Sequence, residues 1–99
     1  MKRGGSVYII TNVHNQVLYT GVTSDLQQRI QQHKENKFET AFSAKYKLDK
    51  LVYYANFLTI EEAILEEKRI KGGSRAKKIK LIESVNGEWK DLWDEVKEW

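Results

Sequence analysis

Two side chains that bind anions stand four residues apart in a segment with helical spacing. Arg29 and His33 would share one face of a helix with the apolar residues Leu26 and Ile30. An arginine turned toward a protein core is costly unless it has a partner. The pair therefore indicates either a structural salt bridge beside a satisfied histidine or a site that binds an anion such as phosphate.

A carboxylate interrupts the apolar face of a second predicted helix. A helical step of about 100° per residue puts Glu67 near the centre of a face built from isoleucine and alanine, with Glu66 at its edge. A carboxylate in that position needs a cation, either Arg29 or a metal ion. Mg²⁺ or Mn²⁺ would suit a single carboxylate beside a phosphate, because such hard ions take oxygen ligands and Mg²⁺ usually keeps several waters.

Two tyrosines lie on predicted strands, where a tyrosine taken singly is more often a packing residue. Tyr8 is on the first strand, and Tyr19 on the second is followed by Thr20 and Gly21. The glycine removes a side chain where a backbone or a ligand can approach closely. The chain has no cysteine, which excludes a thiol nucleophile, a thiolate metal site and a disulfide-linked partner.

The elements that must hold these side chains predict an α+β fold. Strands are expected over residues 6–11, 17–22 and 51–57, and a five-residue loop joins the first two as a hairpin. Helices are expected from the cap Ser24 through His33, from Thr59 to Lys71, from Ser74 to about Glu83, and from Trp89 to Trp99. Residues 34–50 predict mostly loop, with at most a short helical piece. The order β-β-α-β-α-α-α gives a small three-stranded, largely antiparallel sheet flanked by helices.

The composition fits one domain. The 99 residues are 40% apolar and 31% charged, as in a globular chain with one modest core. We expect a single domain over residues 1–99, with a core at about 6–80 and a helical tail at 81–99. The apolar run Val7–Ile10 is too short for a signal peptide or a membrane span. We expect a cytoplasmic protein without a membrane partner, and the oligomeric state stays open.

A basic stretch lies between Lys68 and Lys80, which contains no acidic residue, although the net charge of the chain is only +3. Such a stretch is either a solvated helix face or a surface that binds a polyanion. The candidate residues for binding DNA are Lys68, Lys71, Arg75, Lys77 and Lys78.

The ordered set of motifs over residues 6–80 resembles the GIY-YIG nuclease family. The matching residues are Val7-Tyr8-Ile9, Leu18-Tyr19-Thr20-Gly21, Asp25-Leu26 with Arg29 and His33, and Glu67. The chain is most similar to the short free-standing bacterial members, and also to the N-terminal nuclease domain of the excision-repair incision subunit. It departs from the pattern at Ser6-Val7, at Thr20, and at Gly73, where the short members have tryptophan. The family's later asparagine near the metal has no clear counterpart.

The resemblance implies that the chain hydrolyses DNA phosphodiesters with one divalent ion, Mg²⁺ or Mn²⁺. Glu67 would hold the metal, and Arg29 would bind phosphate oxygens and lower the pKa of a neighbouring tyrosine. Tyr19 would be the general base, and Tyr8 would position the water or share that role. His33 would donate to the phosphate or hold a tyrosine hydroxyl. These five catalytic candidates are expected to converge on one concave surface of the sheet; Arg29 and Glu67 on opposite sides of the sheet would contradict this interpretation of the site.

Two other functions compete with an endonuclease that cuts in a structure-directed or weakly specific way. The first is a catalytically weak module of the same fold that only binds nucleic acid. The second is a partner-binding protein that uses Trp89, Trp93 and Trp99 as its contact surface, although tryptophans at helical spacing more often belong to a core. An inward-facing Glu67 favours the nuclease, because a pure binding module has no need of it.

Overall fold

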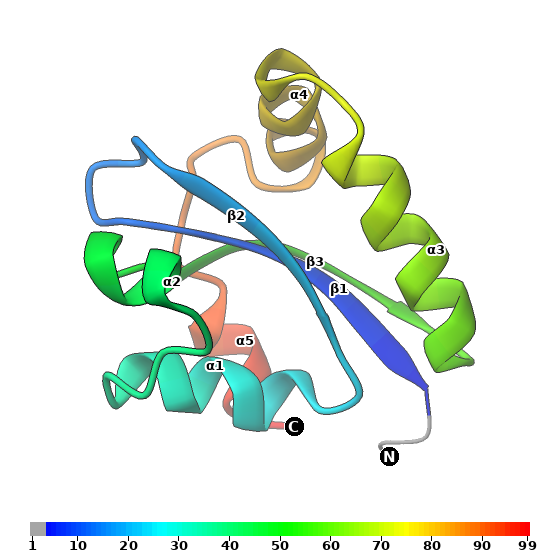
Figure 1. Ribbon diagram of the computed structural model, residues 1–99, viewed down its shortest axis with the longest axis horizontal. Helices are drawn as coiled ribbons and strands as arrows, with labels where there is room; N and C mark the ends of the chain where they lie inside the picture. The colour runs from blue at the N-terminus through cyan, green and yellow to red at the C-terminus, as the bar shows by residue number, and fades with distance from the viewer. Residues whose placement is uncertain (1–3) are drawn as a thin grey trace.

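The computed structural model describes residues 4–99. Within them, strands and helices follow one another as β1 (Gly5–Thr11), β2 (Leu18–Thr23), α1 (Leu26–Lys34), α2 (Ala41–Tyr46), β3 (Lys50–Phe57), α3 (Ile60–Lys71), α4 (Arg75–Val85) and α5 (Trp93–Val96). Figure 1 shows the sheet crossing the centre of the molecule with helices on either side. The predicted α+β architecture is confirmed.

The sheet has β1 in its centre, with β2 and β3 antiparallel on its two sides. Tyr8 on β1 pairs with Gly21 on β2, and Ile10 pairs with Tyr19. Because directly paired residues point to the same face of a sheet, Tyr8 and Tyr19 lie on one face. The hairpin thus brings the two tyrosines together, and β2 is an edge strand.

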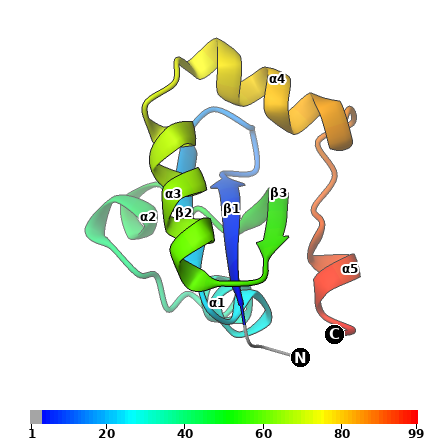
Figure 2. The ribbon, with the colours of Figure 1, turned by 90° about the vertical axis from the view of Figure 1, so that its right-hand side faces the viewer.

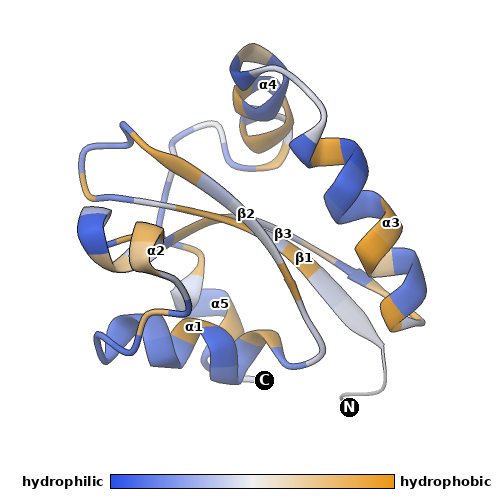
Figure 3. Ribbon diagram, in the orientation of Figure 1, coloured by the Kyte–Doolittle hydropathy of each residue, from blue (hydrophilic) through white to orange (hydrophobic). Residues whose placement is uncertain are grey.

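Helices cover both faces of the sheet (Figure 1), and Figure 2 shows the three strands next to one another with α3 in front of them. Tyr8 and Ile10 pack in a core with Ile30 of α1 and Val96 of α5. Val7 and Ile9 point the other way and pack with residues of α3 and α4. Along α1 and α3, apolar and polar segments alternate (Figure 3), as expected for helices with one buried face. Successive residues of β1 therefore alternate between two cores, one on each face of the sheet.

Local capping interactions fix where the helices begin. The predicted capping box of α3 is present, since Thr59 accepts from the Glu62 backbone and the Glu62 side chain accepts from the Thr59 backbone. Ser74 caps α4 as predicted. The cap of α1 is Asp25, whose carboxylate accepts from the Gln28 backbone, and the prediction of Ser24 was wrong by one residue.

The segment between α1 and β3 holds the short helical piece that was allowed for, whereas the last helix differs from expectation. The weakly periodic stretch contains the helix α2, which Thr40 and Ser43 start with a second capping box. The last predicted helix, Trp89 to Trp99, shrinks to Trp93–Val96. Its first half is not helical because Trp89 has a left-handed φ of 56° and Asn86 donates to the backbone carbonyls of Val52 and Lys90.

None of the helices within residues 4–99 is long and apolar enough to span a membrane. The tryptophans are partly used for packing, since Trp89 contacts one core and Trp93 the other. Trp99 stacks edge-on against Tyr54 at a ring-centroid distance of 5.3 Å. This packing leaves little of a shared tryptophan surface for a partner.

Candidate active site

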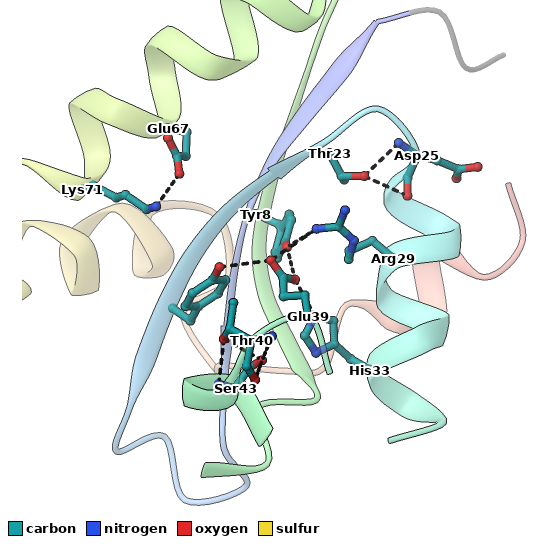
Figure 4. Close-up of polar contacts among 11 residues, drawn as sticks. Tyr8, Thr23, Asp25, Arg29, His33, Glu39, Thr40, Ser43, Glu67 and Lys71 are labelled. Carbon is teal, nitrogen blue, oxygen red and sulfur yellow. Dashed lines mark hydrogen bonds and ion pairs between the residues drawn. The ribbon is translucent and has the colours of Figure 1, made fainter. Parts of the chain in front are cut away.

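Four of the five predicted catalytic side chains converge on the carboxylate of Glu39 (Figure 4). Tyr8 Oη donates to Glu39 Oε1 at 2.5 Å, and Tyr19 Oη donates to Oε2 at 3.0 Å. Arg29 Nη1 lies 3.2 Å from Oε2 and also donates to Tyr8 Oη. His33 Nε2 lies 2.8 Å from Oε1. We call the four donor side chains, Tyr8, Tyr19, Arg29 and His33, the anion seat.

The hairpin of β1 and β2 shapes the anion seat, because Gly21 leaves room for the hydroxyl of Tyr8. Tyr8 is fully buried, and its ring extends over the paired Gly21. A Cβ atom added at Gly21 would lie 2.4 Å from Tyr8 Oη, so any other residue would push the hydroxyl out of place. The close approach predicted at this glycine is confirmed, and the group that approaches is a tyrosine side chain.

Helix α1 supplies two of the donors, Arg29 and His33, from consecutive turns. His33 is fully buried and Arg29 is partly exposed. Since an ionised carboxylate only accepts hydrogen bonds, His33 Nε2 must carry the proton that it shares with Glu39. The other ring nitrogen, Nδ1, is buried and has no hydrogen-bond partner among residues 4–99. The imidazole is therefore held as a donor that points into the anion seat.

The electrostatics keep Glu39 ionised. Burial raises the pKa of Glu39, but hydrogen bonds from His33 and Tyr8 and the charge of Arg29 outweigh burial and bring the pKa to about 2. The side chain of Glu39 is 19% exposed, so it sits near the surface of the seat. A single carboxylate thus satisfies all four donors at once.

The Glu39 carboxylate in turn raises the pKa of both tyrosines. Burial and Glu39 raise the pKa of Tyr8 far above its ordinary value and that of Tyr19 to about 12. Arg29 lowers both, as expected from its charge, but it is outweighed. The prediction that Arg29 lowers the pKa of a neighbouring tyrosine is confirmed in direction, but with Glu39 in place both hydroxyls keep their protons.

Glu67 approaches the seat from the other face of the sheet. It is 9% exposed on the inner side of α3, as the helical spacing predicted. Its cation is Lys71, whose Nζ lies 2.6 Å from the carboxylate, and not Arg29. Figure 4 shows Glu67 and Lys71 across β2 from Tyr8 and Arg29. The expectation of one shared surface is wrong, because α1 and α3 pack on opposite faces.

The two sides meet at the edge strand β2. Lys71 Nζ lies 6.0 Å from the centre of the Tyr19 ring, and the charge of Glu67 contributes to the raised pKa of Tyr19. A strand at the edge of a sheet has no neighbour on one side. A group bound at that edge can therefore contact side chains from both faces.

Glu67 and a hydroxyl on the face of the sheet that α3 covers have the chemistry to bind a hard divalent ion. The Thr20 hydroxyl is buried and lacks a hydrogen-bond partner among residues 4–99. Thr20 pairs with Ile9, so it points to the face that α3 covers. A carboxylate and a hydroxyl are oxygen ligands of the kind that Mg²⁺ accepts when water and phosphate complete its shell. No cluster of three or more acidic or histidine side chains that could hold a metal ion occurs within the described part of the chain.

The basic stretch lines a groove between α3 and α4. The groove has a volume of about 710 Å³, and its lining includes Lys68, Lys77 and Lys80. Lys68, Arg75 and Lys77 are exposed. Lys71 is bound to Glu67, and Lys78 donates to the Gly73 carbonyl at 2.8 Å. Four of the five predicted DNA-binding residues are therefore exposed, and of these only Lys71 is paired with a carboxylate within residues 4–99; Lys78 is half-buried.

The side chains of the anion seat and Glu67 lie in the part of the chain that matches a known protein family. The model of the GIY-YIG catalytic domain matches residues 4–80. The chain belongs to the GIY-YIG family. A UPF0213 protein from Oceanobacillus iheyensis is 41% identical over 81 residues, which cover 78% of this chain and 87% of that protein. A UPF0213 protein from Syntrophus aciditrophicus is 32% identical over 76 residues, covering 77% and 86% of the two chains.

A solved structure has a similar fold to this GIY-YIG domain. The solution NMR structure of a UPF0213 protein from Bacillus halodurans superposes with a TM-score of 0.56 at 30% sequence identity, over 89% of this chain and 92% of that one. The resemblance to short bacterial GIY-YIG proteins is confirmed.

Glu39 is the residue of this GIY-YIG site that the sequence pattern did not predict. The inward-facing Arg29 and His33 predicted an acidic partner, but Glu39 lies outside any periodic segment, one residue before the Thr40 cap of α2. A loop residue gives no sign of the direction in which its side chain points. The signal available was indirect, namely two inward-facing donors that need an acceptor.

The low pKa of Glu39 predicts that the stability of the fold depends on pH. A carboxylate whose pKa falls from 4.5 in the unfolded chain to about 2 in the folded protein stabilises the fold above pH 4.5. That stability is lost as the pH falls toward 2. We expect the thermal unfolding midpoint of wild type to drop more steeply over this range than that of Glu39→Gln. The exposed Glu35→Gln is the control and should follow wild type; parallel curves for wild type and Glu39→Gln would contradict the pairing.

Proposed function

We propose that this chain hydrolyses phosphodiester bonds of DNA with the help of one divalent metal ion. The observation that best supports this proposal is the anion seat, in which four donors meet on one carboxylate. A phosphodiester also presents two charged oxygens, and it suits the same planar guanidinium and the same hydroxyl and imidazole donors. The family of the chain adds the expectation of a nuclease.

In this proposal, Glu39 holds the place that a phosphate takes during the reaction. Arg29 has to exchange the carboxylate for phosphate oxygens, and His33 Nε2 donates to the same group. Both ions compete for the same donors, so entry of the phosphate requires the Glu39 side chain to swing toward solvent, where it is already 19% exposed.

The two tyrosines have different proposed roles. Tyr19 is the better candidate for the general base, because its pKa, at about 12, is the lower of the two. It can accept a proton only after Glu39, which helps to raise that pKa, has left the hydroxyl. Tyr19 also lies at the edge strand, where side chains from both faces meet. Tyr8 is fully buried and donates its proton, so we assign it to positioning the phosphate and the water.

Glu67 and the Thr20 hydroxyl are the residues that would hold the metal, Mg²⁺ or Mn²⁺. A divalent ion there would supply positive charge to the phosphate and the leaving oxygen. For this to happen Lys71 must release the Glu67 carboxylate, and it can do so because its side chain is 52% exposed. The exposed lysine can then turn to a phosphate.

A second candidate function is a module that binds nucleic acid without cutting it. The ion pair between Glu67 and Lys71 favours it, because the carboxylate is neutralised without a metal. The test is cleavage of duplex, single-stranded, flap and branched DNAs with Mg²⁺ or Mn²⁺, with Glu67→Ala as control. Metal-dependent cleavage by wild type alone supports the nuclease; binding without cleavage of any of these DNAs would favour the module.

We predict that the groove between α3 and α4 binds the DNA backbone without reading bases. Each phosphate neutralised in duplex DNA changes the slope of log K against log[salt] by about −0.9. Replacing the exposed Lys68 and Lys77 with alanine should therefore flatten the slope by about 1.8. The charge-matched control replaces Lys90 and Lys97 of the tail, which should leave the slope unchanged. Equal slopes in the two double variants would mean that the groove is only a solvated face.

A further inference from the structure

Three aromatic rings form a row that leads away from the anion seat along α2. The ring centroid of Tyr19 lies 6.2 Å from that of Phe42, which lies 4.9 Å from that of Tyr46. Phe42 and Tyr46 are four residues apart and share one face of the helix. We call Tyr19, Phe42 and Tyr46 the aromatic row. Since Tyr19 Oη donates to Glu39, the row begins in the seat itself.

The outer two rings of the aromatic row are open to solvent. Phe42 is 45% exposed and Tyr46 is 37% exposed, whereas aromatic side chains normally stabilise a fold by being buried. Other residues hold α2 in place, because Ser43 and Leu48 are fully buried and Thr40 caps the helix. The contact between Phe42 and Tyr46 can stabilise the short helix α2, but it would do so equally well if the two rings lay far from the anion seat.

Cations lie among these rings. Lys45 Nζ is 5.3 Å from the centre of the Tyr46 ring, and Lys71 Nζ is 6.0 Å from that of Tyr19. Between Thr40 and Leu48 the sequence has two lysines and no acid. Exposed rings interleaved with positive charge are the chemistry by which proteins bind single-stranded nucleic acid, with bases stacked on the rings and phosphates beside the lysines.

We infer that the aromatic row binds unpaired nucleobases next to the phosphate in the anion seat. In a duplex each base is stacked between its neighbours, so a protein ring can stack only on a base that has left the helix. The inference rests on the proposed function, and it names the substrate class as DNA with a single-stranded segment beside the cleaved bond. Flaps, forks and unpaired ends belong to this class.

The test measures binding in EDTA, so that no cleavage takes place. The probes are a fluorescent oligothymidylate, an abasic strand of the same length and a blunt duplex, each titrated with full-length wild type, Phe42→Ala and Phe42→Leu. Loss of one base–aromatic stack costs roughly 10-fold in affinity. We expect Phe42→Ala and Phe42→Leu to weaken binding of oligothymidylate by about that factor, and to leave the abasic strand and the duplex unchanged.

The leucine variant separates stacking from folding, because leucine keeps apolar contact with Tyr46 but offers no π face. Equal affinity of wild type and Phe42→Leu for oligothymidylate would overturn the inference, as would a loss of equal size for the abasic strand. Binding of polyglutamate that falls with Phe42→Ala would instead point to an acidic peptide. If the variants show base stacking but wild type cuts none of the DNAs, the inference stands and the proposed nuclease activity is wrong. If wild type cuts DNA but binds unpaired bases no better than a duplex, the nuclease activity stands and the inference is wrong.

Discussion

Replacing Glu67 with alanine is expected to abolish metal-dependent cleavage and to leave DNA binding intact or slightly stronger. Removing a negative charge does not weaken attraction to a polyanion, and Lys71 is released to contact phosphate. The fold should survive, because alanine suits a helix interior and the exposed lysine can turn to water. Cleavage is measured by nicking of plasmid DNA, and binding by titration in EDTA.

Its neighbour Glu66 provides the matched control. Glu66 lies at the edge of the inner face of α3 and pairs with the exposed Arg69, and exposed ion pairs of this kind contribute little to stability. Glu66→Ala should therefore cut DNA as wild type does. A separate measurement checks the metal: Mn²⁺ should raise the unfolding temperature of wild type and Glu66→Ala but not that of Glu67→Ala. An active Glu67→Ala would rule out metal binding by this carboxylate as the basis of catalysis.

The strands and α3 could be predicted because their signals are local. Residues 51–57 contain Val52, two tyrosines and Phe57, residue types that favour strands, and the observed strand is Lys50–Phe57. Thr59 and Glu62 mark the start of α3 by a capping box that depends on nothing outside the helix. Glu67 was placed on the inner side of α3 for the same reason, since helical spacing alone decides it.

The rest of the site depends on contacts that are distant in sequence. Helical spacing shows that Arg29 and Glu67 face inward, but it does not show which face of the sheet each helix covers. Only the pairing and packing of β1 place α1 and α3 on opposite sides. Glu39 enters the seat through hydrogen bonds to Tyr8, Tyr19 and His33, and those donors come from two strands and a helix. The truncation of the last helix likewise depends on Asn86 reaching the backbone of β3.

Replacing Arg29 with alanine is expected to slow cleavage by about 10²-fold or more, as when a donor that stabilises transition-state charge is lost. Arg29 is partly exposed and reaches the seat from α1, so its guanidinium can turn to a phosphate without a change in the helix. Single-turnover rates at saturating enzyme separate this loss from weaker binding. Arg29→Lys should recover only part of the rate, since an ammonium group cannot make the paired hydrogen bonds of a guanidinium.

The competing explanation is that Arg29 only holds Glu39, to which it is bound at 3.2 Å. The same substitution in a Glu39→Gln background separates the two. A glutamine side chain has nearly the same shape as glutamate and carries no charge, so Arg29 no longer has a carboxylate to neutralise. If Arg29 acts on the phosphate, Arg29→Ala should cost about 10²-fold or more in both backgrounds. If it serves Glu39 alone, the cost should disappear in the glutamine background, and the anion seat would then be an internal ion cluster.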